Sequence, residues 1–221
     1  MTAISIIVHM TRTAIHKRGA TSAYLRDPAA IYRRSFALIR REVDLARWPR
    51  DLRPVALRLV HTSGEPAILD DLVWSDGAAR IGRRALEQGA KILVDAAMVA
   101  AGITGRRTLC TLNDRRVPAL ARRLQTTRSA AAVELWRPHL EGAVIAIGNA
   151  PTALFHLLEL LAAGAPRPAL VLGFPVGFVG ASEAKTALAH NSWNIPFIAL
   201  SGRRGGSALA AAAVNALEPR K

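Results

Sequence analysis

Short apolar runs alternate with longer stretches of helical periodicity along most of the 221 residues. Apolar runs bounded by glycine, proline or polar residues predict strands. Such runs span residues 91–95, 109–112, 143–147, 168–173 and 196–200. Strands separated by helices are typical of a parallel sheet, because each parallel crossover needs a connection of helix length. We therefore expect an α/β fold: a single domain with a mainly parallel sheet of about five strands flanked by helices.

The first predicted helix begins at Pro28 and carries a polar residue on its apolar face. Asp27 precedes it as an N-cap, and proline is favoured in a first turn. Three apolar residues share a face with Ser35, namely Ile31, Leu38 and Ile39. Because residues three and four apart lie on the same side of a helix, we expect Ser35 to face a buried partner.

The second helix is predicted to begin near Pro54 and to end at Gly64, since glycine commonly stops a helix. His61 then lies in the last turn, next to a polar run that continues to Glu65. The negative end of a helix favours a protonated imidazole by about 0.3–1 kcal/mol. Histidine titrates near neutral pH and commonly acts as a general acid. We treat His61 as a candidate general acid.

Two glycine-rich turns each follow a predicted strand and open a helix. The first comprises residues 148–152 and the second residues 173–180. In the first turn, small residues and a proline leave backbone N–H groups directed at the turn, which favours anion binding. Ligands of open parallel sheets bind beyond the carboxyl ends of the strands. The residues expected to contact a ligand there are Gly148, Asn149, Thr152, Gly177 and Gly180.

The chain is strongly basic, with 30 Lys and Arg against 16 Asp and Glu and a formal net charge of +14. This balance indicates an acidic partner, such as nucleic acid, an anionic membrane or a ligand rich in carboxylates or phosphates. Aromatic residues make up only 5%, which disfavours stacking on single strands, and no nucleic-acid-binding motif is present. No apolar run reaches the about 18 residues of a membrane helix. We therefore expect a cytoplasmic protein that binds neither nucleic acid nor a membrane.

Common cofactor and nucleophile motifs are absent from the sequence. The second turn lacks the G-x-G-x-x-G spacing, and neither a P-loop nor a G-x-S-x-G run occurs. The six histidines show no paired spacing with cysteine or acidic residues, so we expect no metal. His156, among leucines on a helix, fits a packing role. Cys110 is the single cysteine; it excludes a disulfide within the chain and is expected as a small core residue.

No internal repeat or shift in composition marks a second domain. Residues 1–23 contain basic residues but no acidic ones, and no apolar segment precedes a cleavage-like site. We expect residues 1–23 to be a disordered N-terminal extension and residues 24–221 to form the domain.

Several segments together resemble the precorrin-8X methylmutase family of corrinoid (vitamin B12) biosynthesis. The similar segments are residues 24–36, 58–64, 95–104, 127–132, 147–154, 173–180 and 202–207. They include the runs Arg58-Leu-Val-His-Thr-Ser-Gly64 and Gly173-Phe-Pro-Val-Gly-Phe-Val-Gly180. Each segment alone is weak evidence, but the set occurs in order from Tyr24 to the C-terminus and is specific.

The resemblance implies an isomerase that moves a methyl group from C11 to C12 of precorrin-8X to give hydrogenobyrinate, without an external cofactor. It implies that His61 is the acid that protonates the macrocycle. Ser35, Thr104 and Arg128 match family residues that would orient the ring and its side chains. Next to Thr104, the chain departs from the family at Ala97, where a basic residue is common. The resemblance also implies a homodimer with active sites near the subunit interface.

A tetrapyrrole fringed with carboxylates suits a basic chain, because arginine forks and backbone N–H groups bind carboxylates. Two alternatives remain open. A non-catalytic corrinoid carrier would use the same turns, and a nucleotide- or nucleic-acid-binding α/β domain would also account for the charge. The sequence leaves open whether the substrate carries cobalt.

Overall fold

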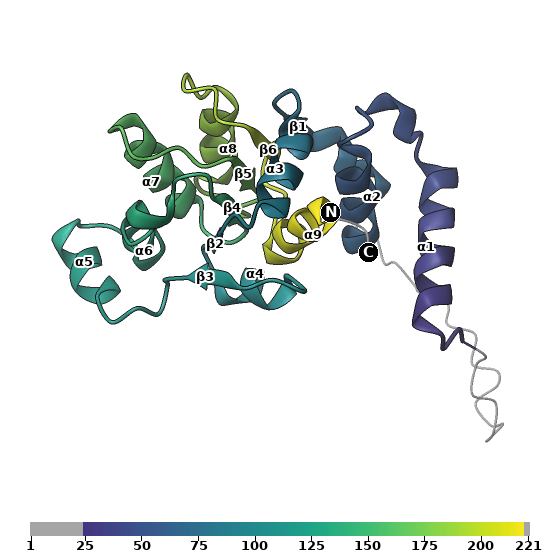
Figure 1. The fold of residues 1–221 in the computed structure, drawn as a ribbon, viewed down its shortest axis with the longest axis horizontal. Helices are drawn as coiled ribbons and strands as arrows, with labels where there is room; N and C mark the ends of the chain where they lie inside the picture. Colours follow the sequence, from purple (N-terminus) through teal and green to yellow (C-terminus); the bar gives the residue numbers. More distant parts are fainter. Residues whose placement is uncertain (1–23, 219–221) are drawn as a thin grey trace, which may run out of the picture.

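The computed structural model describes residues 24–218 and shows a central sheet with helices on both faces (Figure 1). Within these residues the sheet has six strands in the order β1-β6-β5-β4-β2-β3. The strands are β1 (Leu72–Trp74), β2 (Ile92–Val94), β3 (Thr108–Cys110), β4 (Val144–Ile147), β5 (Leu170–Gly173) and β6 (Phe197–Leu200). β1 is antiparallel to β6, and the other neighbours are parallel. The predicted α/β fold is confirmed, with β1 added at one edge. The predicted extension, residues 1–23, lies outside the described residues.

The helices largely follow the predicted periodicity. The α-helices of the described chain are α1 (Pro28–Glu42), α2 (Arg53–Ser63), α3 (Ala78–Glu87), α4 (Ala97–Gly102), α5 (Val117–Arg123), α6 (Arg128–Glu134), α7 (Pro151–Ala162), α8 (Ala181–Ala189) and α9 (Ser207–Leu217). Short 3-10 helices are η1 (Leu45–Arg47), η2 (Pro66–Asp71) and η3 (Arg137–His139). The sequence did not predict α4, because six residues are too few to show a helical period.

Both faces of the sheet are buried, as expected for parallel strands covered by helices. Neighbouring residues of β4, such as Val144 and Ile145, belong to different apolar cores. One core is covered by α3, α4 and α9, with α2 outside α9; the other is covered by α6, α7 and α8 (Figure 1). α9 packs closely because it is rich in alanine: a Cβ placed on Gly148 would lie 2.8 Å from the Cβ of Ala210. The turn after β4 is therefore pressed against the start of α9.

α1 lies at the outer end of the molecule, beyond α2 (Figure 1). Asp27 caps it as predicted, since its carboxylate accepts two N–H groups of the first turn. Ile31 and Leu38, however, are 42% and 46% exposed, and of this helix only Ile39 is buried. The expectation of a buried apolar face is therefore wrong for most of α1, because α1 packs mainly on α2 and lies beyond it at the outer end of the molecule.

Two further predictions concern single residues near the sheet. Cys110 is only half-buried, because β3 is an edge strand, so the expected core position is only partly correct. His156 has the predicted packing role: its ring nitrogens contact Glu134 at 2.9 Å and Glu159 at 3.1 Å. Among the helices of residues 24–218, none has the length and apolar character that crossing a membrane would require.

Candidate active site

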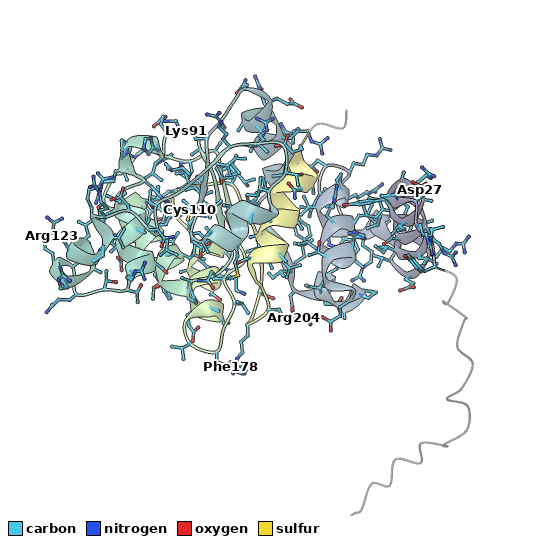
Figure 2. All side chains as sticks on the ribbon, turned by 90° about the horizontal axis from the view of Figure 1, so that it is seen from below. Asp27, Lys91, Cys110, Arg123, Phe178 and Arg204 are labelled. Atoms are coloured by element: carbon cyan, nitrogen blue, oxygen red, sulfur yellow. The ribbon has the colours of Figure 1, made fainter. Side chains whose placement is uncertain are left out.

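The loops after the parallel strands meet at one end of the sheet, which we call the carboxyl edge. The loops after β5 and β6 are joined there, because the N–H of Gly206 donates to the carbonyl of Phe174 at 2.8 Å. Figure 2 shows Phe178 and Arg204 on this side of the molecule and Lys91, which precedes β2, on the opposite side. The carboxyl edge is where the sequence predicts ligand binding.

A cleft of about 470 Å³ lies at the carboxyl edge, beside the end of α2. The guanidinium of Arg204 pairs with Asp71 at 2.8 Å and with Glu65 at 3.4 Å, which ties the loop after β6 to the segment after α2. Phe178 is 83% exposed, and the guanidinium of Arg203 lies 5.0 Å from its ring centroid. The lining includes Ser63, Ile68, Val176, Gly177, Arg203 and Leu209. Apolar side chains next to guanidinium groups suit a ring that carries carboxylates.

His61 lies in the last turn of α2, as predicted, and contacts Ser35 of α1. Ser35 Oγ lies 2.8 Å from His61 Nδ1. The rings of Tyr32 and Phe36 flank the imidazole, each with its centroid 5.1 Å away. Within residues 24–218, no group forms a hydrogen bond with Nε2 of His61. The hydroxyl therefore orients the ring through one nitrogen and leaves the other for a ligand.

The electrostatic surroundings of His61 oppose the sequence-based argument for a protonated ring. Burial lowers the pKa of His61 below its ordinary value, and the positive charge of Arg58 lowers this pKa further. Arg58 is held nearby by a 2.8 Å hydrogen bond to the hydroxyl of Tyr32. The expected effect of the helix end is therefore outweighed. The approach of a negative ligand would favour a proton on His61.

The first glycine-rich turn already holds an anion that belongs to the chain itself. Asp95, which follows β2 and is 3% exposed, accepts the backbone N–H groups of Gly148, Asn149 and Ala150 at 2.8, 2.9 and 2.8 Å. Burial raises the pKa of Asp95, although the three donors oppose this rise. The expectation that these N–H groups bind a ligand is therefore wrong, because they point inward to Asp95. Gly148 is buried, whereas Asn149 is exposed.

Arg128 and Thr152 lie at the carboxyl edge on the β3 side of the sheet. Arg128 Nη2 donates weakly to the Leu112 carbonyl and to Asn113, both at 3.4 Å. Thr152 shares a 2.8 Å hydrogen bond with Thr127, the N-cap of α6. Arg128 is exposed and, among the described residues, forms no salt bridge. Its guanidinium is free to bind a carboxylate.

Thr104 lies at the other end of the sheet. Its N–H and hydroxyl contact Asn215 Oδ1 at 3.0 and 3.4 Å, near the end of α9. A cavity of about 600 Å³ nearby is lined by basic residues, including Arg106 and Arg107. It is larger than the cleft at the carboxyl edge, but it contains none of the other candidates. Within one chain, the structure therefore does not bring Thr104 to the remaining candidate residues.

The candidates fall into two groups. His61, in the last turn of α2, pairs with Ser35 of α1. Neither residue lines the cleft itself, which begins two residues later at Ser63 and includes Gly177. Arg128 and Thr152 begin α6 and α7, and Figure 1 shows α6 on the opposite side of the sheet from α2. A single chain therefore does not place Arg128 next to His61.

Sequence reasoning missed Lys185, in the middle of α8. Its side chain is 1% exposed, and Nζ donates to the carbonyl of Arg204 at 2.6 Å. Burial lowers the pKa of Lys185 to about 8, against an opposing effect of Asp71. The sequence carried a signal, because residues 181, 184 and 188 of the same face are apolar and buried. A lysine in that row is a buried charge. No cluster of three or more potential metal ligands was found in the part of the chain that the structure describes.

Comparisons with known proteins identify the family and the fold. The family model "CbiC: Precorrin-8X methylmutase" matches residues 30–218. A precorrin-8X methylmutase of Pseudomonas aeruginosa is 59% identical over 200 residues, which cover 88% of this chain and 96% of that protein. A cobalt-precorrin-8 methylmutase of Priestia megaterium is 34% identical over 198 residues, 86% of this chain and 87% of its own length.

A solved structure, a precorrin-8X methylmutase of Thermus thermophilus, has a TM-score of 0.78 and 39% identity and covers 86% of this chain and 94% of that one. Sequence and fold thus agree over nearly the whole described length, and the resemblance drawn from the sequence segments is confirmed. The chain belongs to the precorrin-8X methylmutase family of isomerases in cobalamin biosynthesis.

Proposed function

We propose that this protein moves a methyl group from C11 to C12 of precorrin-8X to give hydrogenobyrinate, with His61 as the acid that protonates the macrocycle. The observation that carries this proposal is the Ser35–His61 pair, whose Nδ1 contact of 2.8 Å leaves Nε2 available. Protonation draws electron density from the ring and lowers the barrier to a 1,5 shift. The methyl group moves with its bonding electrons and the proton is returned, so the reaction needs no oxidant and no group donor.

The low pKa of His61 fits this role when the ligand is a polycarboxylate. Without a ligand, burial and Arg58 disfavour the imidazolium. Carboxylates placed nearby favour it. His61 would therefore take up its proton together with the substrate and release it to the ring, whose delocalised electrons accept it. Ser35 can either donate to or accept from Nδ1, because a hydroxyl does both.

The remaining candidates would bind the periphery of the tetrapyrrole. Arg203 and Gly177 line the cleft beside α2, and arginine forks bind carboxylates in a bidentate manner. We propose that Gly180, Asn149 and Thr152 border the same ligand, and that Arg128 binds a carboxylate. The inward-pointing N–H groups beside Gly148 confine that residue to shaping the turn.

We also propose a homodimer in which the copies complete each other's sites. Two observations support it: α6, which begins at Arg128, lies on the opposite side of the sheet from α2, which contains His61 (Figure 1), and α1 exposes apolar residues on the helix that carries Ser35, including Ile31 and Leu38. A second copy would cover that face and bring further groups to the substrate, among which we place Thr104. The single cysteine, which precludes an internal disulfide, suits the reducing cytoplasm that we propose as the location.

Replacing His61 by alanine tests the mechanism. Loss of a general acid typically costs 10²- to 10⁴-fold in rate, so we expect H61A to convert precorrin-8X at least about 100-fold more slowly while its affinity for hydrogenobyrinate is retained. The conversion is followed by absorbance, and affinity by spectral titration. H190A is the matched control, because His190 is exposed at the end of α8.

A normal rate in H61A would contradict the proposed acid. If even the unmodified protein binds the corrinoid without converting it, the carrier alternative holds. Binding of nucleotide or DNA in place of the corrinoid would favour the nucleic-acid alternative.

A further inference from the structure

Lys185 is a buried charge that the mechanism above does not use. Its ammonium is 1% exposed and has one hydrogen-bond acceptor, the carbonyl of Arg204, at 2.6 Å. Among the described residues it forms no salt bridge. Burying an ammonium group costs free energy unless it is well paired. A lysine in this position therefore weakens the fold near neutral pH, and packing alone does not account for it.

The carbonyl that Lys185 holds belongs to the loop of residues 201–206, which we call the arginine loop. The backbone of this loop is fixed at both ends, by Ser201 N–H to the Asp71 carbonyl at 2.7 Å and by Gly206 N–H to the Phe174 carbonyl at 2.8 Å. Between these ends the loop has two further backbone contacts: the Gly177 N–H donates to the Arg203 carbonyl at 3.3 Å, and the shorter contact, at 2.6 Å, is that of Lys185 with the Arg204 carbonyl.

The side chains of the arginine loop lie on the outer side, in the cleft. The guanidinium of Arg204 pairs with Asp71 and Glu65, and that of Arg203 lies over the ring of Phe178. Both residues line the cleft. Arg204 therefore connects two contacts: its carbonyl faces Lys185, and its guanidinium reaches the segment that follows α2 and His61.

We propose that Lys185 is a positioning residue for substrate binding: its protonated amine holds the arginine loop so that Arg203 and Arg204 meet the carboxylates of the macrocycle. This inference rests on the proposed function. A charged donor forms a hydrogen bond roughly twice as strong as a neutral one. Deprotonation of Lys185 therefore loosens the loop.

The deprotonation of Lys185 should be visible in a pH profile, because the charged groups around it do not titrate in the same range. Its titration falls near pH 8. The charge that acts on Lys185 is Asp71 of η2, which pairs with the outward guanidinium of Arg204, and Glu183 lies on the same helix, exposed. Carboxylates, including those of the substrate, are ionised well below about pH 7, and arginine stays protonated throughout this range. Of these groups around the arginine loop, Lys185 alone changes charge in this window.

Stability and binding then change in opposite directions as the pH rises. Because the folded-state pKa of Lys185 is below that of an unfolded lysine, the unfolded chain holds more protons between about pH 8 and 10.5, and the folded state gains stability over that interval. A lysine with a structural role alone would leave affinity unchanged or improved. A positioning lysine makes affinity fall while stability rises.

The experiment measures KM, kcat and the affinity for hydrogenobyrinate from about pH 7 to pH 10, together with thermal unfolding. Because His61 takes up its proton with the substrate, KM rises with pH even where residue 185 keeps its charge. For the unmodified protein we expect an additional rise of KM above about pH 8, with little change in kcat. K185M should show a KM about tenfold higher at pH 7, the factor that about 1.4 kcal/mol represents, without the additional rise at higher pH. K185R should also lack the additional rise, because its charge persists. K91M, which changes an exposed lysine at the opposite end of the sheet, should match the unmodified protein.

A KM of the unmodified protein that rises no more between pH 8 and 10 than the KM of K185R would overturn the inference, and so would a K185M variant with unchanged KM. The first result uses K185R, which keeps the charge, so it decides even if K185M does not fold. If the unmodified protein neither converts precorrin-8X nor binds hydrogenobyrinate at any pH, the proposed function itself fails, and the inference falls with it.

Discussion

The turn after β4 and the loop after β6 are both glycine-rich, both open a helix and both lie at the carboxyl edge, but buried charges of opposite sign hold them. Asp95 accepts three N–H groups of the turn at Gly148. Lys185 donates to one carbonyl of the arginine loop. In the turn, the donors therefore point into the protein; in the loop, an acceptor points inward and the guanidinium groups point outward.

This difference shows that a glycine-rich turn before a helix is not by itself a ligand site. The N–H groups that such a turn exposes can be satisfied from inside the protein, and the sign of the buried partner decides which groups remain for a ligand. At the turn after β4 the chain's own carboxylate occupies the anion site. At the arginine loop Arg204 is paired with Glu65 and Asp71, whereas the guanidinium of Arg203 forms no salt bridge among the described residues and lines the cleft.

Removal of the Asp95 carboxylate should have the largest effect, because it takes away the buried charge that holds the turn after β4. D95A leaves three N–H groups without their charged acceptor, and each lost bond of this kind costs about 1.5–3 kcal/mol before relaxation and entry of water. We expect the free energy of unfolding to fall by about 4 kcal/mol, measured by denaturant titration. D95N, which keeps one acceptor oxygen, should lose less. D70A, at an exposed aspartate of η2, should change stability by no more than about 0.5 kcal/mol. A D95A protein as stable as D70A would show that the turn is held by other contacts.

Substitution of Gly205 should have a smaller effect on stability. It disturbs the arginine loop while the buried charges of Asp95 and Lys185 stay in place. A Cβ at Gly205 would meet the carbonyl oxygens of Phe174 and Pro175, the second at 2.5 Å. We expect G205A to lose about 2 kcal/mol of unfolding free energy through overpacking, and to weaken hydrogenobyrinate binding in a spectral titration. The control is G89A, at a glycine with positive φ and open space around it, where strain alone costs about 1 kcal/mol. Unchanged binding in G205A would separate the loop from the substrate site.

The fold could be predicted because short runs of neighbouring residues mark its strands and its helix ends. The five predicted strands carry apolar residues on both faces, as a parallel sheet requires, and capping residues such as Asp27 and Gly64 mark helix ends. β1 was missed because it follows a 3-10 helix directly and pairs antiparallel to β6, so it lies outside the alternation of strands and helices that indicated the parallel strands.

The site could be predicted only in part, because its contacts join distant segments. The sequence indicated separately that Ser35 faces a partner and that His61 ends a helix, but their pairing depends on how α1 packs against α2. Asp95 was expected only as the end of a strand, because its role depends on N–H groups more than fifty residues later, at 148–150. The position of Thr104 at the opposite end depends on α9, whose course only the fold reveals.

The pH dependence of kcat/KM tests the central claim, that the protonated form of His61 acts on the substrate. Since kcat/KM reports groups of the free enzyme and the pKa of His61 is lowered by burial and by Arg58, activity should fall with rising pH through a midpoint below about 6.5. R58Q should move this midpoint upward, because it removes a positive charge that disfavours the imidazolium. R123Q, at the far end of the molecule (Figure 2), should leave it in place. A midpoint that does not move in R58Q, or activity that does not fall over this pH range, would contradict the assignment of His61 as the acid.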